Sequence, residues 1–191
     1  MMHFFVLLSC LFFSTLRAAT FNITEVARFT MTNPNYVFNA PALITANGQA
    51  LVAGSDSVLY FLDQNANLQK IFKANDSFRS APTALPNGGW AVSSQDKRVY
   101  LLNSEGHLTT AVHFSSPNLS RPVVFGDVSF LIASENTVYF QNFSGDFLNL
   151  FTTGGRANLP LAINHELFVV GDSLGNINFV DRNAKVLIRA S

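Results

Sequence analysis

The residues that could carry chemistry are few and widely spaced. His107, His113 and His165 are separated by 6 and 52 positions, which gives neither the HxH nor the HxxxH spacing of a metal-binding pair. No GxSxG nucleophile elbow is present, and the Gly154-Gly155 pair lacks the strand-to-helix setting of a phosphate-binding loop. The sequence therefore assigns no catalytic, cofactor-binding or metal-ligating residue. It predicts a protein that is not an enzyme and holds no cofactor.

The acidic residues are mostly spaced one per predicted turn, as at Asp63, Glu105, Asp146 and Asp181. Asp and Asn are common in turns because they tolerate left-handed backbone and accept bonds from nearby N–H groups. We therefore interpret these residues as turn formers. His107, His113 and His165 also fall in or beside predicted turns or strand ends, where we expect exposed side chains.

The charge pattern does not predict a nucleic-acid-binding surface. Twelve Lys and Arg balance twelve Asp and Glu, and only 13% of residues are charged. Phosphate neutralisation needs clustered cations, whereas the nearest approach to a cluster is the pair Lys97 and Arg98. We interpret that pair as a solvated strand edge.

The first residues read as a targeting segment. Phe4 to Phe13 is an apolar run of signal-peptide length, too short for a membrane-spanning helix. We expect residues 1–18 to be a signal peptide that is cleaved after Ala18, although Lys and Arg are missing ahead of the apolar run. The mature chain is then exported, periplasmic or secreted, with no transmembrane segment.

The single cysteine, Cys10, would be lost with that peptide, so the mature chain would have no disulfide. The stretch "LLSC" loosely resembles a lipoprotein box, but more apolar residues follow it, which disfavours lipid anchoring at Cys10. Four glycosylation sequons matter only in a host that glycosylates secreted proteins. They begin at Asn22, Asn75, Asn118 and Asn142.

A repeat of about forty residues organises the rest of the chain. Three columns recur in step: a proline, an aromatic position and a turn-forming Asp or Asn. The columns are Pro41, Pro82, Pro122 and Pro160; Tyr60, Tyr100, Tyr139 and Asn178; and Asp63, Asn103, Asn142 and Asp181. Three columns with one period are hard to obtain by chance, so we treat the repeat as structural.

Each unit has the pattern of four short antiparallel strands, and nowhere is there an apolar stripe of helical period. The proline opens the first strand, where a missing N–H costs no ladder bond. An Asn-Gly turn such as Asn87-Gly88 suits a two-residue hairpin, in which both central residues have positive φ. The Asp/Asn column should accept bonds in the turn that also contains Ala66, Gly106, Gly145 or Ala184.

These units predict an all-β chain built as a β-propeller from four-stranded antiparallel blades. Residues 19–191 form the propeller, with an orphan outer strand at 23–31 ahead of the blades. The four blades cover about 40–80, 81–120, 121–158 and 159–191. We expect the Tyr column to pack one blade on the next.

The stretches "APALITANGQALVAGSDSVLYFLDQNANLQKIF" and "APTALPNGGWAVSSQDKRVYLLNSEGHL" resemble repeats of the quinoprotein-like, or PQQ-repeat, β-propellers. The resemblance covers residues 40–191. It implies rings of seven or eight blades, and a family that contains quinone-dependent dehydrogenases, a propeller of the outer-membrane β-barrel assembly machinery, and sensor ectodomains. This chain is closest in style to the non-enzymatic members.

For a dehydrogenase the resemblance implies a quinone and Ca²⁺ on the ring axis, a catalytic Asp, and a TG…W motif that closes each repeat. This chain has one tryptophan, Trp90, which lies in a second strand, and no TG pair at the repeat ends. No cofactor ligand can be carried over. A fragment of a quinone-dependent dehydrogenase is kept as an alternative, as is a truncated propeller without independent function.

Four units leave three architectures open: an open arc, a small closed ring, or half a ring completed by a second copy. An open arc would expose apolar blade faces and predicts a homodimer or poor solubility. We expect a non-enzymatic interaction scaffold, whose most concrete setting is cell-envelope or outer-membrane protein assembly. Protein partners would bind exposed blade faces or the inter-blade loops, at Ala74–Ser80, Ser115–Arg121 and Thr152–Asn158.

Overall fold

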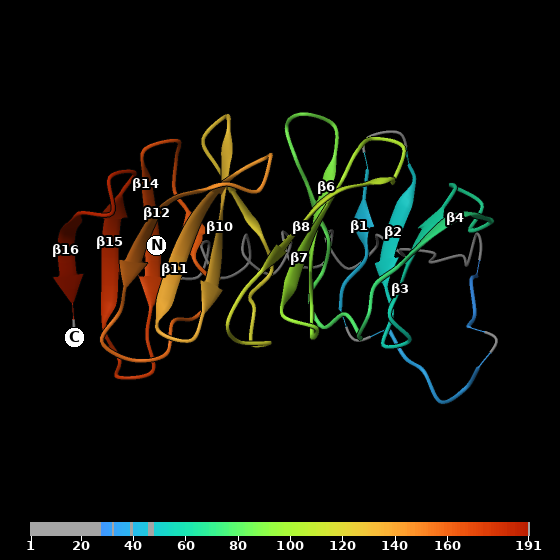
Figure 1. Ribbon diagram of the computed structural model, residues 1–191, viewed down its shortest axis with the longest axis horizontal. Helices are drawn as coiled ribbons and strands as arrows, with labels where there is room; N and C mark the ends of the chain where they lie inside the picture. Colours follow the sequence, from blue (N-terminus) through green and yellow to red (C-terminus); the bar gives the residue numbers. More distant parts are fainter. Residues whose placement is uncertain (1–27, 32, 39, 46–47, 191) are drawn as a thin grey trace, which may run out of the picture.

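The computed structural model describes residues 28–190 except 32, 39, 46 and 47, and these residues form four sheets of four antiparallel strands (Figure 1). In every sheet the strands lie side by side in chain order. The strands are β1 (Leu43–Ile44), β2 (Ala50–Ala53), β3 (Val58–Leu62) and β4 (Leu68–Lys73) in blade 1; β5 (Thr83–Ala84), β6 (Trp90–Ser94), β7 (Arg98–Leu102) and β8 (Leu108–His113) in blade 2; β9 (Val123–Phe125), β10 (Ser129–Ser134), β11 (Thr137–Asn142) and β12 (Phe147–Thr152) in blade 3; and β13 (Leu161–Ala162), β14 (Leu167–Gly171), β15 (Ile177–Asp181) and β16 (Val186–Ala190) in blade 4.

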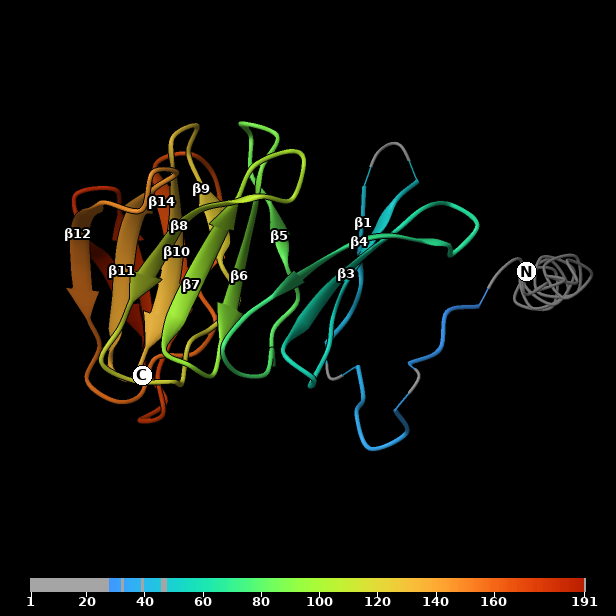
Figure 2. The same cartoon turned by 45° about the vertical axis from the view of Figure 1, so that its right-hand side comes forward.

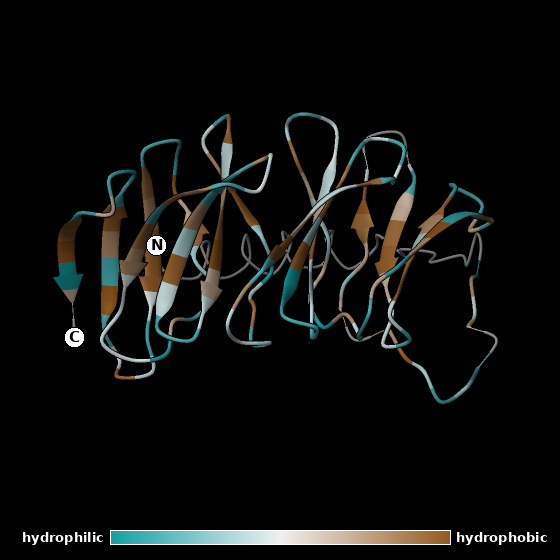
Figure 3. Cartoon of the chain, viewed as in Figure 1, coloured by the Kyte–Doolittle hydropathy of each residue, from teal (hydrophilic) through white to brown (hydrophobic). Residues whose placement is uncertain are grey.

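The described residues contain no helix, and so no helix that could span a membrane. Apolar residues gather in the strands and polar residues in the loops that join them (Figure 3). This separation is what the alternating strand pattern predicted. The all-β fold and the four-stranded blades are confirmed.

The turn between the third and fourth strands follows the predicted chemistry in every blade. Asn103, for example, accepts bonds from the backbone N–H groups of Glu105 (3.0 Å) and His107 (2.9 Å). The residue that ends each of these loops has left-handed backbone, with φ of 59°, 76°, 95° and 62° at Ala66, Gly106, Gly145 and Ala184. The Asp/Asn column is therefore a column of turn formers.

The turn at Asn87-Gly88 differs from the prediction. Gly88 has a φ of +83°, but Asn87 is absent from the residues with positive φ. The Leu85 N–H donates to the Gly89 carbonyl (2.9 Å) and the Gly88 N–H donates to the Leu85 carbonyl (2.9 Å). The hairpin therefore has a three-residue loop, which needs one left-handed residue rather than two.

Three apolar clusters hold the four blades together, one at each junction. The first joins blades 1 and 2 around Phe78, the second joins blades 2 and 3 around Phe130, and the third joins blades 3 and 4 around Phe168. No cluster of the described residues joins blade 4 to blade 1. The blades fan out as an open arc with blade 1 and blade 4 at opposite ends (Figures 1 and 2). The small closed ring is therefore wrong.

The tyrosines of the Tyr column pack blades 1, 2 and 3 against the chain that precedes each of them, as predicted; blade 4 has Asn178 at this position. The ring of Phe72 lies 5.1 Å from Tyr100, and the ring of Phe114 lies 5.3 Å from Tyr139, each reaching across a blade junction. At Tyr60 the same place is taken by Phe29, at 5.2 Å. Phe29 belongs to the stretch predicted as an outer strand at 23–31. Residues 28–31 form no strand, and residues 23–27 lie outside the described part of the chain.

The prolines stand at equivalent positions, just ahead of the first strand of each blade. Pro82, Pro122 and Pro160 are buried, whereas Pro41 is exposed. The difference follows from the arc, because no described blade precedes the first one. The recurrent proline therefore marks where the chain enters each blade from the linker, as its missing N–H allows. The predicted signal peptide at residues 1–18 lies outside the described residues.

Candidate functional site

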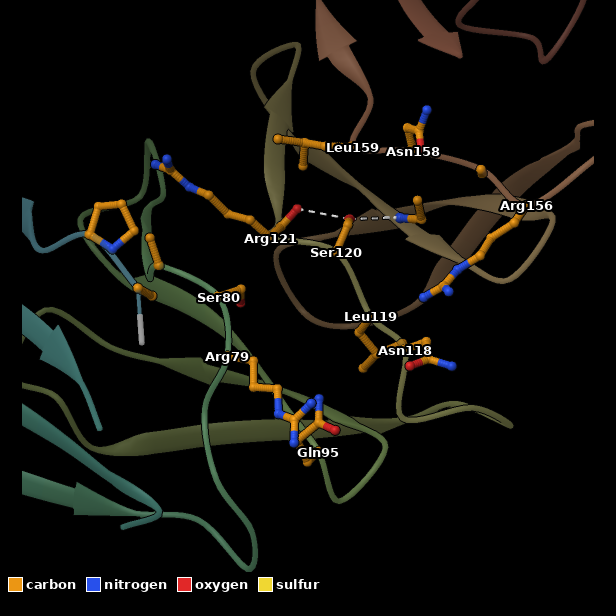
Figure 4. Close-up of a pocket in the computed structure, with 15 residues that line it drawn as sticks. Arg79, Ser80, Gln95, Asn118, Leu119, Ser120, Arg121, Arg156, Asn158 and Leu159 are labelled. Atoms are coloured by element: carbon orange, nitrogen blue, oxygen red, sulfur yellow. Dashed lines mark hydrogen bonds between the residues drawn. The ribbon is translucent and has the colours of Figure 1, made fainter. Parts of the chain in front are cut away.

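The linkers that enter the four blades meet at one cavity of about 680 Å³, which we call the linker cavity (Figure 4). It lies where the first strands begin, and β9 and β13 are neighbours there. Its lining consists of Ala40, Pro41, Arg79, Ser80, Ala81, Gln95, Asn118, Leu119, Ser120, Arg121, Ala133, Arg156, Ala157, Asn158 and Leu159. All three predicted inter-blade loops contribute to it, but only through their final residues.

Backbone hydrogen bonds hold each linker against the next blade. The N–H of Ser120 donates to the Ala133 carbonyl (2.8 Å), and the N–H of Asn158 donates to the Gly171 carbonyl (2.9 Å). Each linker also forms one isolated antiparallel β-bridge to the blade that it enters, as between Phe78 and Ser94. The linkers are thus hydrogen-bonded to the sheets. These bonds fix the position of the linker backbone from which the cavity side chains project.

Arg79, Arg121 and Arg156 line the linker cavity from three different linkers, and Figure 4 shows their side chains pointing in different directions. All three residues are exposed. The Arg121 Nε donates to the Thr83 hydroxyl (3.0 Å), which itself donates to the Pro122 carbonyl (2.6 Å). Among the described residues, no carboxylate lies within ion-pair distance of any of the three. Their charge is therefore available, and it is permanent at any physiological pH.

Neutral hydrogen-bond donors complete the lining. The Ser80 hydroxyl is buried and has no hydrogen-bond partner among the described residues. The Asn118 amide donates to Glu135 (3.0 Å), and the Gln95 amide donates to the Pro117 carbonyl (3.3 Å). The Ser120 hydroxyl accepts from the Ala133 N–H and donates to the Arg121 carbonyl, at 2.9 and 3.0 Å (Figure 4).

Glu135 lies beside this lining without being part of it. Hydrogen bonds from Ser116 and Asn118, and the charge of Arg156, hold the pKa of its carboxyl below the ordinary value. No described Asp or Glu lines the cavity. A cavity with three cations and no lining anion suits a ligand that presents carboxylates or other anionic acceptors.

The residues screened for catalysis lie apart from the cavity. The His107 Nδ1 lies 3.2 Å from the Glu105 carboxylate and the His165 Nδ1 lies 3.4 Å from the Asp127 carboxylate, with all four side chains exposed, and His113 ends β8. In the described ranges, no three His, Cys, Asp or Glu side chains gather as they would around a metal ion. The sequence singled out no site residue, so the three arginines were missed. The only available signal was that each predicted inter-blade loop contains one Arg.

Solved structures resemble this arrangement. A chain of BamB from Moraxella catarrhalis matches with a TM-score of 0.68 and 17% identity, over 79% of this chain and 48% of that one. The WD40 β-propeller domain of Doa1 matches with a TM-score of 0.65 and 16% identity, over 79% of this chain and 53% of that one. This protein therefore spans about half the length of these propellers.

No family model matches the chain, and no curated protein matches its sequence. The two solved neighbours come from different propeller classes, so they support the propeller fold and leave the PQQ-repeat resemblance a prediction. At identities below one fifth, such likeness speaks for the fold alone. The described residues form an open β-propeller of four blades.

Proposed function

We propose that this protein is an exported, non-enzymatic scaffold that holds a protein partner at the linker cavity. The predicted signal peptide at residues 1–18 supports export to the periplasm or beyond. The resemblance to propellers of outer-membrane assembly makes the cell envelope the most concrete setting. A second copy of the chain is a further candidate partner.

The observation that carries the proposal is that three linkers meet at one cavity, each with an arginine that forms no ion pair with a described carboxylate. Arg79, Arg121 and Arg156 are far apart in the sequence, and only blade stacking brings them together. Exposed cations without partners cost nothing in the free protein, because water solvates them. They become useful when a partner brings carboxylates, which Arg can bind through two parallel hydrogen bonds.

The binding test uses a fluorescent peptide rich in Asp and Glu, and the same peptide with Asn and Gln in their place. We expect the acidic peptide alone to bind in fluorescence anisotropy. A triple variant with Arg79→Gln, Arg121→Gln and Arg156→Gln should bind it roughly tenfold more weakly, at about 0.5 kcal/mol for each exposed pair. The binding should also weaken with added salt, because exposed charges are screened.

The matched control carries Lys73→Gln, Lys97→Gln and Lys185→Gln, which remove the same total charge at exposed positions outside the cavity. We expect this control to bind the acidic peptide like the unaltered protein. Equal loss in both triple variants would show that net charge governs binding, and the cavity would then be dismissed as the partner site. Equal binding of both peptides would dismiss it as well.

The non-enzymatic part of the proposal has its own test. The alternative of a dehydrogenase fragment predicts that the quinone cofactor with Ca²⁺ binds the protein. We expect neither a change in the quinone absorbance nor a rise in melting temperature when both are added. A saturable absorbance change would favour the alternative.

Export is tested by producing the full chain in a bacterial host and sequencing the N-terminus of the protein recovered from the periplasm. We expect it to begin at Ala19, after cleavage behind Ala18. A Cys10→Ser variant should be processed identically. Recovery of the intact chain in the cytoplasm, or a lipid attached at Cys10, would overturn this assignment.

A further inference from the structure

Blade 4 has one face that no described residue covers. Its apolar side chains are Leu161, Val169, Ile177, Phe179 and Ile188, which we call the trailing face. Val169 pairs across the strands with Leu161 and with Phe179, and Phe179 pairs with Ile188, so the four lie in one row across the sheet. Ile177 lies two residues from Phe179 on the same strand, and therefore on the same side.

The equivalent face of blade 3 is a buried blade junction. Leu131, Val138 and Phe140 stand at the positions of Val169, Ile177 and Phe179 in the repeat. They are 0%, 0% and 3% exposed, because Phe168, Val170 and Val180 of blade 4 pack on them. On the trailing face, by contrast, Ile177 at the position of the buried Val138 is 47% exposed, and Leu161 at the position of the half-buried Val123 is 63% exposed. Ile188 extends this apolar surface onto the outer strand and is 60% exposed. Among the described residues, the trailing face is thus a blade-receiving surface that no blade covers.

The first blade carries the complementary surface. Its face toward the chain start, the leading face, contains Ile44, Val52, Tyr60 and Ile71, with Val52, Tyr60 and Ile71 in one row. Phe29 and Phe38 pack on Tyr60, but Ile44 and Ile71 remain 63% and 51% exposed. The described chain therefore ends in two different apolar faces, one that receives a blade and one that docks onto a blade.

We infer that a second copy of this chain covers the trailing face with its own leading face, and that the exchange is reciprocal. The arc of four blades superposes on 48% of one solved propeller and 53% of another. Its curvature is therefore that of about half a ring, so two arcs joined head to tail would close on themselves. Such a head-to-tail contact closes into a ring when the rotation per chain fits, and otherwise grows into a filament.

The reciprocal arrangement gives two identical junctions. Each needs to bury only about 400 Å² per partner for the total to reach the roughly 1,600 Å² of an ordinary stable interface. A junction of the kind between blades 3 and 4 is apolar and closely packed, as obligate interfaces are. This inference deepens the proposed scaffold by naming one partner, and it rests on the blade faces rather than on the linker cavity.

The test measures the mass of the full chain by light scattering and by sedimentation. We expect a dimer of the 20.9 kDa chain. Ile188→Asp on the trailing face and Ile44→Asp on the leading face should each give a monomer, with at least tenfold weaker association. Both side chains are exposed in the single chain, so the fold should persist by circular dichroism. The control Val128→Asp alters a residue that is 61% exposed on blade 3, in neither face, and should remain a dimer.

Mixing the two monomeric variants separates this arrangement from others. The Ile188→Asp chain keeps an intact leading face and the Ile44→Asp chain an intact trailing face, so together they can form one unaltered junction. We expect the mixture to dimerise more than either variant alone. A monomeric unaltered chain would overturn the inference, as would an Ile44→Asp chain that still dimerises, which would indicate trailing face on trailing face.

The two proposals can fail separately. The triple Arg→Gln variant should keep its dimeric mass while it loses the acidic peptide. The Ile188→Asp variant should keep the acidic peptide while it loses the dimer, because its linker cavity is unaltered. A variant that loses both properties together would show that the cavity depends on the dimer.

Discussion

Replacing Phe168 by Ala should loosen blade 4 while it leaves the first two blades intact. Phe168 is fully buried and its ring lies 5.6 Å from Phe125, 5.4 Å from Phe140 and 6.4 Å from Phe151. Removing a buried Phe from such a cluster costs about 3–5 kcal/mol, because both the transfer free energy and the packing around the cavity are lost. With an m-value of about 2 kcal/mol/M, the urea midpoint of the affected part should fall by about 2 M.

Trp90 makes this loss local and visible. It is the only tryptophan, and it packs against the cluster between blades 1 and 2. In a stack where each repeat contacts only its neighbours, damage at one junction need not reach the far end. We expect the far-UV circular dichroism of Phe168→Ala to show an early transition that Trp90 fluorescence does not report.

The matched variant is Phe78→Ala, which removes an equally buried ring from the cluster next to Trp90. Its fluorescence transition should move to lower urea. If circular dichroism and fluorescence of Phe168→Ala instead shift together, the four blades unfold as one cooperative unit. A shift below about 1 kcal/mol would refute the packing estimate itself.

Three further predictions concern local features. Burial, and then the hydrogen bond to Asp56, raise the pKa of Tyr60 to about 12. Because this pKa lies above the unfolded value near 10, the unfolding free energy should be unaffected below about pH 10 and should fall as the pH rises toward 12. Asp56→Asn should lower the pKa of Tyr60 in a spectroscopic tyrosine titration. Asn103→Ala removes the acceptor of two backbone N–H groups and should cost about 1 kcal/mol in urea unfolding, whereas Ser104→Ala should change little. Ala184→Gly should stabilise blade 4 by up to about 1 kcal/mol in thermal melts. The reason is that Ala184 has a φ of 62°, a conformation that glycine adopts without strain. A lower melting temperature of the variant would contradict this reason.

The blade plan could be predicted because its causes are local in the sequence. Strand alternation, the Asx bonds of Asn103 and the left-handed turn at Ala184 each depend on residues a few positions apart. Repetition of these signals then fixes the strand order within each blade. The conformation of the turn at Asn87 was predicted wrongly, because the length of the loop, rather than the Asn-Gly pair, decides how many residues need positive φ.

The linker cavity could not be predicted from spacing. Arg79, Arg121 and Arg156 are separated by 42 and 35 positions, so they do not follow the repeat as the Pro and Tyr columns do. They meet because each linker runs along the edge of the next blade and ends where the first strands begin. A constellation built from non-equivalent residues of successive repeats leaves no periodic trace.

The sequence by itself determined that this protein is a stack of four antiparallel sheets, because hydrogen bonding and burial within each sheet act over some forty residues. Only the tertiary structure decided that the described blades form an open arc, that no other described blade covers Leu161, Ile177 and Ile188, and that three arginines line one cavity. These features depend on the angle between neighbouring blades, summed over three junctions. That sum is set by how large side chains such as Phe78, Phe130 and Phe168 interlock, which the pattern of apolar residues does not specify.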